Sequence, residues 1–168
     1  MARLIDLNVT TYWWVAAADI TNTASISAAK LTTANNISQY VVSTTTAGPT
    51  ASDTVSERSI SDTSNVVVPT IGNYEGSLVL FRDYSAGAPT ANDVLTTIAG
   101  ASGVTGWLVK RVGLASNAAA ASGQKIAFVG KFTTDSPQVS GGAGDGYIKA
   151  TIPLLQAGTY ATEVTLSA

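Results

Sequence analysis

The sequence contains neither cysteine nor histidine among its 168 residues. Without cysteine, the chain cannot form disulfides, thiolate nucleophiles, zinc knuckles or iron–sulfur clusters. Without histidine, it lacks the most common general base near neutral pH and the most common ligand of transition metals. These two absences exclude most familiar catalytic and metal-binding classes, and we expect no cofactor.

Charge is also scarce. Only 12% of the residues are charged, about half the usual ~25% of soluble chains. The net charge of −2 and the pI of 4.8 argue against a protein that grips nucleic acid by releasing counterions. Yet 45% of the residues are hydrophobic, and the mean hydropathy is +0.23. Two solutions remain open: a surface hidden against copies of the same chain, or a compact monomer coated with the serine and threonine that make up about a quarter of the sequence.

Long hydrophobic runs are missing. The N-terminus is interrupted by Asp6, and the apolar stretch that starts at Tyr12 ends at Asp19, far short of the ~20 residues that a bilayer requires. We therefore expect a soluble chain without a signal peptide or a membrane span. The length suits one domain over residues 1–168.

Alternation of apolar and polar residues predicts many short strands, with turns of glycine and proline between them. Such spacing is typical of a β-sandwich or a barrel. The pattern in 125–132 places Ile126, Phe128 and Phe132 on one face. The pattern in 159–166 places Tyr160, Val164 and Leu166 on one face. The expected strands are Thr11–Ala17, Ile37–Ser43, Val55–Ser61, Asn65–Val68, Glu75–Asp83, Val104–Val112, Lys125–Phe132, Tyr147–Ile152 and Thr159–Leu166.

Other segments are expected to be helical or extended. Residues 90–100 predict a helix that begins at a Thr90 cap and ends at Gly100. Residues 27–34 predict a shorter helix. Residues 1–18 are expected to form an N-terminal arm and the first strand, and residues 43–52, with three successive threonines, an extended loop.

Local motifs give little support to catalysis. Ser27 and Lys30 fit an S-x-x-K pattern, but the other motifs of that enzyme class are missing. The glycine-rich stretch 141–146 lacks the ending of a phosphate-binding loop and predicts a hairpin connection. An enzyme that uses a carboxylate pair is the least supported hypothesis. Its candidate acids are Asp53, Glu57, Asp62, Asp83 and Asp93.

Trp13 and Trp14 are adjacent, so on a strand they point to opposite faces. One of them can fill the core. The other is then exposed or packed against a neighbouring chain. The alternative is that the N-terminal arm covers both within one subunit.

A succession of local sequences gives the chain a family resemblance. From about residue 12 to the C-terminus, it resembles the tail tube (major tail) proteins of long-tailed bacteriophages, especially the short form found in phages of actinobacteria. The sequences that carry the resemblance are Asp19-Ile20, Ile37-Ser38-Gln39-Tyr40-Val41, Ala51-Ser52-Asp53-Thr54-Val55-Ser56-Glu57-Arg58-Ser59, Asn73-Tyr74-Glu75-Gly76-Ser77-Leu78, Arg111-Val112-Gly113, Asp135-Ser136-Pro137-Gln138 and Gly146-Tyr147-Ile148-Lys149-Ala150-Thr151.

The resemblance implies a β-sandwich or barrel with one flanking helix and no catalytic residues. Six copies would form a ring, and rings would stack into a hollow tube that conducts the genome during ejection. The implied partners are further copies, a tape measure protein, a tail tip and a terminator. Double-stranded DNA would pass without specific binding, and no membrane would be involved. The implied location is the virion tail, assembled in the host cytoplasm.

Within this hypothesis, some residues are expected at contacts between subunits: Trp13, Trp14, Thr44, Thr45, Thr46, Glu57 and Arg58. Asp53, Glu57 and Asp62 are expected to face the lumen, where negative charge discourages DNA adhesion. A solvated outer face or salt bridges between subunits is the alternative for these acids. A carbohydrate- or host-binding β-sandwich of a virion, motivated by an exposed tryptophan and a surface rich in serine and threonine, is the alternative function.

Overall fold

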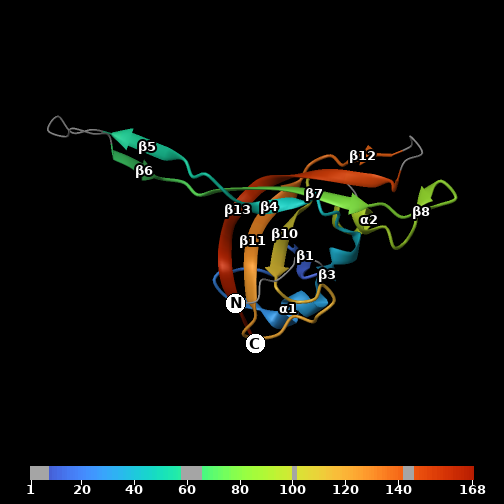
Figure 1. Ribbon diagram of the computed structural model, residues 1–168, viewed down its shortest axis with the longest axis horizontal. Coiled ribbons are helices and arrows are strands. Elements are labelled where there is room, and N and C mark those ends of the chain that lie inside the picture. Colours follow the sequence, from blue (N-terminus) through green and yellow to red (C-terminus); the bar gives the residue numbers. More distant parts are fainter. Residues whose placement is uncertain (1–7, 58–65, 100–101, 142–145) are drawn as a thin grey trace.

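A computed structural model describes residues 8–57, 66–99, 102–141 and 146–168. In this part of the chain, most strands join one large sheet (Figure 1), in the order β3-β1-β10-β11-β13-β7-β4, with β12 and β2 also paired to β13. All pairs are antiparallel except β2 with β13. Its strands are β1 (Thr10–Ala16), β2 (Ile26–Ser27), β3 (Asn35–Asn36), β4 (Thr46–Thr50), β7 (Asn73–Phe81), β10 (Thr105–Val112), β11 (Lys125–Thr134), β12 (Gln138–Ser140) and β13 (Lys149–Ser167).

The remaining elements are short. Two hairpins stand apart from the large sheet: β5 (Thr54–Glu57) with β6 (Val66–Pro69), and β8 (Tyr84–Ser85) with β9 (Ala88–Pro89). The helices are α1 (Ala28–Thr33), the 3-10 turn η1 (Ser38–Tyr40) and α2 (Val94–Ala99). The expected mainly β fold with a flanking helix is confirmed. None of the helices in the described ranges is long and apolar enough to cross a bilayer.

Each face of the sheet carries its own hydrophobic core. Trp14 belongs to a cluster with residues of β7, β11 and α2, and we call this side the Trp14 face. Trp13 belongs to a second cluster closed by Leu31 of α1, on what we call the Trp13 face. The exposed fractions are 3% for Trp13 and 5% for Trp14. The expectation that one of them is exposed or contacts a neighbouring chain is therefore wrong, because elements of the same chain cover both faces.

The long strand β13 replaces two expected strands, and it changes face along its length. Tyr160 packs against the Trp14 cluster, whereas Val164 and Leu166 lie in the Trp13 cluster. Between them, Glu163 adopts a φ of 54°, which breaks the regular alternation of a strand. The expectation that Tyr160, Val164 and Leu166 share one face is wrong for this reason.

The neighbouring strand β11 changes face at the same level. Ile126 lies in the Trp13 cluster, but Phe128 and Phe132 lie in the Trp14 cluster. Ile126 pairs with Val164, and Phe128 pairs with Thr162, so the change in β11 stands opposite the irregular residue of β13. The expectation that the three apolar residues of β11 share one face is therefore also wrong.

The segment expected to form an extended loop is instead the strand β4. Thr50 pairs with Asn73 of β7, and Thr46 pairs with Ser77. Just before β4, the buried Thr45 hydroxyl accepts a hydrogen bond from the amide of Val79 at 2.9 Å and lies 3.2 Å from its carbonyl. This side chain takes the place of a backbone pair, so residues 45–50 are anchored to the sheet and are not a free loop.

The expected strand Ile37–Ser43 is also replaced. Residues 38–40 form η1, and only Val41 makes a bridge, with Leu80. The Ser38 hydroxyl accepts a hydrogen bond from the amide of Tyr12 at 2.9 Å. Ile37, 1% exposed, anchors the turn in the Trp14 cluster.

The helix α2 begins at Val94, four residues after the expected Thr90 cap. Asp93 takes the capping role, because its carboxylate accepts a hydrogen bond from the amide of Leu95 at 3.4 Å. The same carboxylate accepts hydrogen bonds at 3.2, 2.9 and 2.6 Å from Arg82, which follows β7. This buried ion pair fastens α2 to the end of the sheet. The short helix α1 is capped by Ser27, whose hydroxyl accepts a hydrogen bond from the amide of Ala29.

Candidate interaction surfaces

Three of the candidate acids each have a different hydrogen-bond partner. Asp53 accepts a hydrogen bond from Asn73, Asp83 from Thr90, and Asp93 from Arg82. No group of three or more histidine, cysteine, aspartate or glutamate residues that could hold a metal occurs in the described ranges. The geometry therefore gives no support to the carboxylate-pair hypothesis. Of its other candidates, Glu57 lies in β5, and Asp62 lies outside the described residues.

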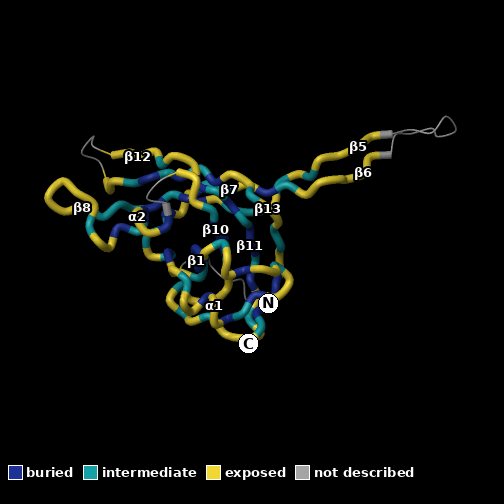
Figure 2. Tube along the Cα trace, turned by 180° about the vertical axis from the view of Figure 1, so that it is seen from behind, coloured by how far each residue is buried: buried dark blue, intermediate teal, exposed yellow. Residues whose placement is uncertain are grey.

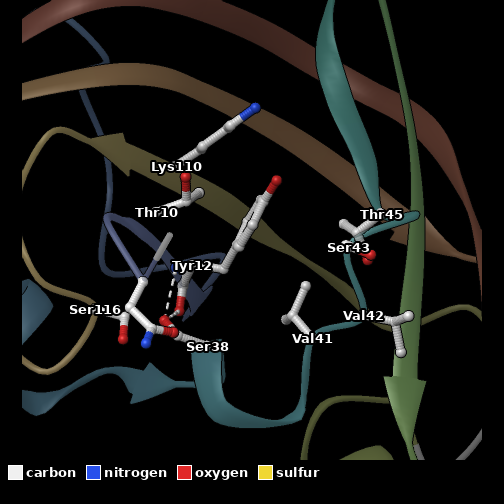
Figure 3. Close-up of a pocket in the computed structure, with 10 residues that line it drawn as sticks. Thr10, Tyr12, Ser38, Val41, Val42, Ser43, Thr45, Lys110 and Ser116 are labelled. Carbon is white, nitrogen blue, oxygen red and sulfur yellow. Dashed lines mark hydrogen bonds between the residues drawn. The ribbon is translucent and has the colours of Figure 1, made fainter. Parts of the chain in front are cut away.

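An open hollow of about 340 Å³ lies between the start of β1, residues 38–45 and the end of β10. Its wall is mostly polar, and Figure 3 shows Tyr12, Val41 and Lys110 around it. The Lys110 ammonium lies 5.8 Å from the centre of the Tyr12 ring. Serine and threonine hydroxyls and one lysine can bind polar groups.

A buried arginine stabilises the loop between β10 and β11. Burial lowers the pKa of the Arg111 guanidinium, which lies 4.9 Å from the ring centre of Trp13. It donates hydrogen bonds to Gln124 at 2.8 Å and to the carbonyl of Ala118 at 2.8 Å. Thr11 accepts a further bond at 3.1 Å. These contacts point inward, so Arg111 is a structural residue.

The most prominent surface is the hairpin β5–β6, which extends away from the sheet (Figures 1 and 2). It continues the β4–β7 pair in the same register. Thr50 pairs with Asn73, and Thr54, four residues after Thr50, pairs with Pro69, four residues before Asn73. We call residues 54–57 and 66–69 the arm. Three of its valines are exposed: the exposed fractions are 45% for Val55, 59% for Val67 and 52% for Val68.

A second exposed apolar surface lies at the other end of β7 and at the start of β13. The rings of Phe81 and Tyr147 meet edge to face with centres 5.4 Å apart. The Lys149 ammonium lies 5.8 Å from the centre of the Phe81 ring. Tyr147 is 78% exposed. We call Phe81, Tyr147 and Lys149 the aromatic patch.

The structure separates the residues that the sequence proposed for subunit contacts. Thr44 and Thr46 are exposed, but Thr45 is buried beneath them. Trp13 and Trp14 are buried in the two cores, and Glu57 is the last residue of β5. Of the proposed lumen acids, Asp53 is exposed at the base of the arm. Arg58 and Asp62 lie outside the described residues.

Sequence reasoning missed both exposed apolar surfaces. The Val66-Val67-Val68 run was a signal for the arm, but alternation alone assigns such a run to an ordinary strand. The aromatic patch had no signal, because Phe81 and Tyr147 are 66 positions apart and meet only when β7 pairs with β13.

Comparisons with known proteins agree with this architecture. A family model described as phage tail tube protein matches residues 1–168. One similar solved chain comes from a structure described as "Cryo-EM structure of the anti-feeding prophage (AFP) baseplate, 6-fold symmetrised". The TM-score is 0.50 at 14% identity, over 96% of this chain and 98% of that one, and this likeness concerns the fold. No curated protein matched the chain.

Proposed function

Because this chain belongs to the phage tail tube protein family, we propose that six copies form a ring and that rings stack into a hollow tube that conducts the phage genome. The family makes it a structural protein of the virion tail. The observation that carries the finer proposal is the family match over the whole chain, together with an apolar arm that extends from the sheet. The 6-fold symmetry of the similar baseplate structure supports a six-fold assembly.

Low charge suits a conduit. DNA must slide past the wall, so the wall must not collect the lysines and arginines that release counterions from phosphate. The chain has only 9 such residues and a net charge of −2. Among those described, Arg82 and Arg111 are buried. We propose that acids near the arm, with Asp53 as the exposed example, face the bore.

Further partners belong to the same proposal. A tape measure protein, a tail tip and a terminator would start, measure and close a tube of many rings. Assembly would take place in the host cytoplasm before the tail joins the virion. The carbohydrate-binding alternative has lost the exposed tryptophan that partly motivated it, since all three tryptophans are buried, with exposed fractions of 3% to 5%.

Purified protein provides the test. Light scattering after size-exclusion chromatography and negative-stain electron microscopy should show rings or tubes with a central hole, at high concentration or with tail-tip proteins as nucleators. A monodisperse monomer under all these conditions would contradict the proposal. Particles with another number of subunits would contradict the hexamer alone.

A further inference from the structure

Two further hollows adjoin the one drawn in Figure 3. The second, of about 220 Å³, shares Ser38 and Ser116 with it. The third, of about 160 Å³, shares Asn36 and Asn117 with the second. We call the three adjoining hollows the groove. The residues that line the groove come from three segments: 8–13, 31–45 and 110–120.

Hydrogen bonds within the chain fix the two walls of the groove. The Asn36 side chain donates to the carbonyl of Ser116 at 3.1 Å and so ties one wall to the other. Its side-chain oxygen accepts from the Ser38 hydroxyl at 2.6 Å. On the other wall, Arg111 holds the carbonyl of Ala118 at 2.8 Å. A ligand would therefore not have to order these walls, which lowers the entropic cost of binding.

The lining of the groove is polar but almost uncharged. It consists largely of serine and threonine hydroxyls and side-chain amides, groups that both donate and accept hydrogen bonds. Among the described residues that line it there is no acid, and Lys110 is the one cation. A single cation cannot replace the counterions along a phosphate backbone, so nucleic acid does not suit the groove. An uncharged ligand with many hydroxyls does.

Two amides in the second hollow are placed to meet such a ligand. Gln39 and Asn117 are exposed, and no hydrogen bond of either side chain is found among the described residues. Each amide presents a donor and an acceptor side by side, so it can bind two adjacent hydroxyls of one sugar ring. The neighbouring third hollow adds the alanine methyl groups of residues 118–120. They offer an apolar surface to the C–H face of a sugar, and no exposed tryptophan is needed.

An extended peptide fits the groove less well. Peptides that bind beside a sheet usually add a strand to an edge through main-chain hydrogen bonds. Here the edge of β1 is already paired within the chain, because Trp13 pairs with Asn36. The carbonyl of Tyr12 accepts a hydrogen bond from the amide of Ile37 at 3.0 Å. A ligand in the groove therefore meets mainly side chains.

We propose that the groove binds an uncharged oligosaccharide. The amides of Gln39 and Asn117 bind its hydroxyls, and one sugar face lies on the alanine methyl groups of residues 118–120. This inference goes beyond the proposed function and does not depend on it, because a single chain supplies the whole groove.

Saturation-transfer difference NMR on the full chain tests the inference. The probes are maltohexaose, cellohexaose, xylohexaose and chitohexaose, with an uncharged hexapeptide of glycine and serine for comparison. Ring protons of at least one hexasaccharide should receive saturation, and the peptide should receive none. The Kd should be about millimolar, because hydrogen bonds to exposed groups add little net free energy.

A pair of matched double variants locates the binding site. Gln39→Ala with Asn117→Ala removes both amides from the groove and should raise the Kd at least about tenfold. Gln138→Ala with Asn92→Ala removes the same two side-chain types outside the groove and should change the Kd less than about twofold. All four positions are exposed, so both double variants should keep the circular dichroism spectrum and the Tm of the parent.

The outcomes separate this inference from the proposed function. No saturation transfer to any of the four sugars would overturn the inference, and so would equal binding by the two double variants. Transfer to the peptide alone would also overturn it and would identify a peptide groove. Rings or tubes that bind no sugar would contradict the inference and leave the proposed function intact. A monomer that binds a sugar through Gln39 and Asn117 would support the inference while the proposed function fails.

Discussion

The hydroxyl of Tyr74 on β7 accepts a hydrogen bond from the amide of Gly158 on β13 at 3.2 Å. The amide of Ala157 lies at the same distance, and the hydroxyl donates to the carbonyl of Lys131. Here three residues of β13 stand opposite one residue of β11, because Gly130 pairs with Tyr160 and Phe132 with Gln156. The phenol thus satisfies backbone groups that a bulge removes from the ladder.

Tyr74→Phe should destabilise the fold by about 0.5 to 1.5 kcal/mol, because it removes the acceptor of two partly buried amides. The free energy of unfolding from urea denaturation measures this change. Tyr160→Phe is the matched control, since Tyr160 packs beside Tyr74 with ring centres 5.1 Å apart and no hydrogen bond of its hydroxyl is found among the described residues. A loss below about 0.5 kcal/mol is expected for the control. Equal losses would refute the role of the Tyr74 hydroxyl.

Gly106→Ala should also destabilise the protein. A Cβ at Gly106 would come within 2.6 Å of the Trp14 ring, which is too close for any real contact. The ring or the backbone must shift, at a cost of about 1 to 3 kcal/mol. Gly48→Ala in β4 is the control, because a Cβ there meets nothing within 4 Å. Thermal unfolding of both variants should show a lower Tm only for Gly106→Ala, and a lower Tm for both would mean that glycine itself is needed in these strands.

Asp93→Asn should lower the free energy of unfolding far more than the loss of an exposed ion pair does. Asp93 is 0% and Arg82 5% exposed, so the substitution leaves a buried guanidinium without its counter-charge, at about 3 to 5 kcal/mol. Asp19→Asn removes the partner of Lys30 at the surface and should cost less than about 1 kcal/mol. Guanidinium chloride denaturation of the two variants tests the difference. Similar midpoints would show that the Arg82–Asp93 pair does not hold α2.

Glu163→Gly should stabilise the protein by about 1 kcal/mol, since Glu163 has a φ of 54° that glycine adopts without strain. Thr162→Gly, one residue earlier, should destabilise by about 0.5 to 1 kcal/mol, because glycine in an ordinary strand position loses more entropy on folding. If β13 changes face at Glu163, urea denaturation should show a higher free energy of unfolding for Glu163→Gly and a lower one for Thr162→Gly. A loss of stability in Glu163→Gly would contradict this explanation.

Local alternation located most strands of the sheet. Residues 104–112 were expected to form a strand and form β10, and residues 75–83 largely form β7. Alternation is a local property, so a single sequence suffices to predict it. It failed at Ala157-Gly158, where a turn signal marks a bulge inside one long strand. A glycine permits either a turn or a bulge, and the pairing with β11 decides between them.

The candidate surfaces were predicted less well than the strands. Trp13 and Trp14 were correctly assigned to opposite faces, yet both are buried. Which face is covered depends on where α1 and α2 pack, and these contacts join residues far apart in the chain. For the same reason, the Phe81–Tyr147 contact had no sequence signal.

The sequence by itself determined the chemistry that this protein lacks and the β character of its chain, because both follow from residue types and their local order. It also carried the family resemblance that the match over residues 1–168 bears out. Only the tertiary structure decided that residues 46–50 join the sheet and that residues 54–57 and 66–69 leave it. Strand pairing joins residues that are far apart in the chain, so which strands pair depends on the other strands of the sheet and not on local sequence.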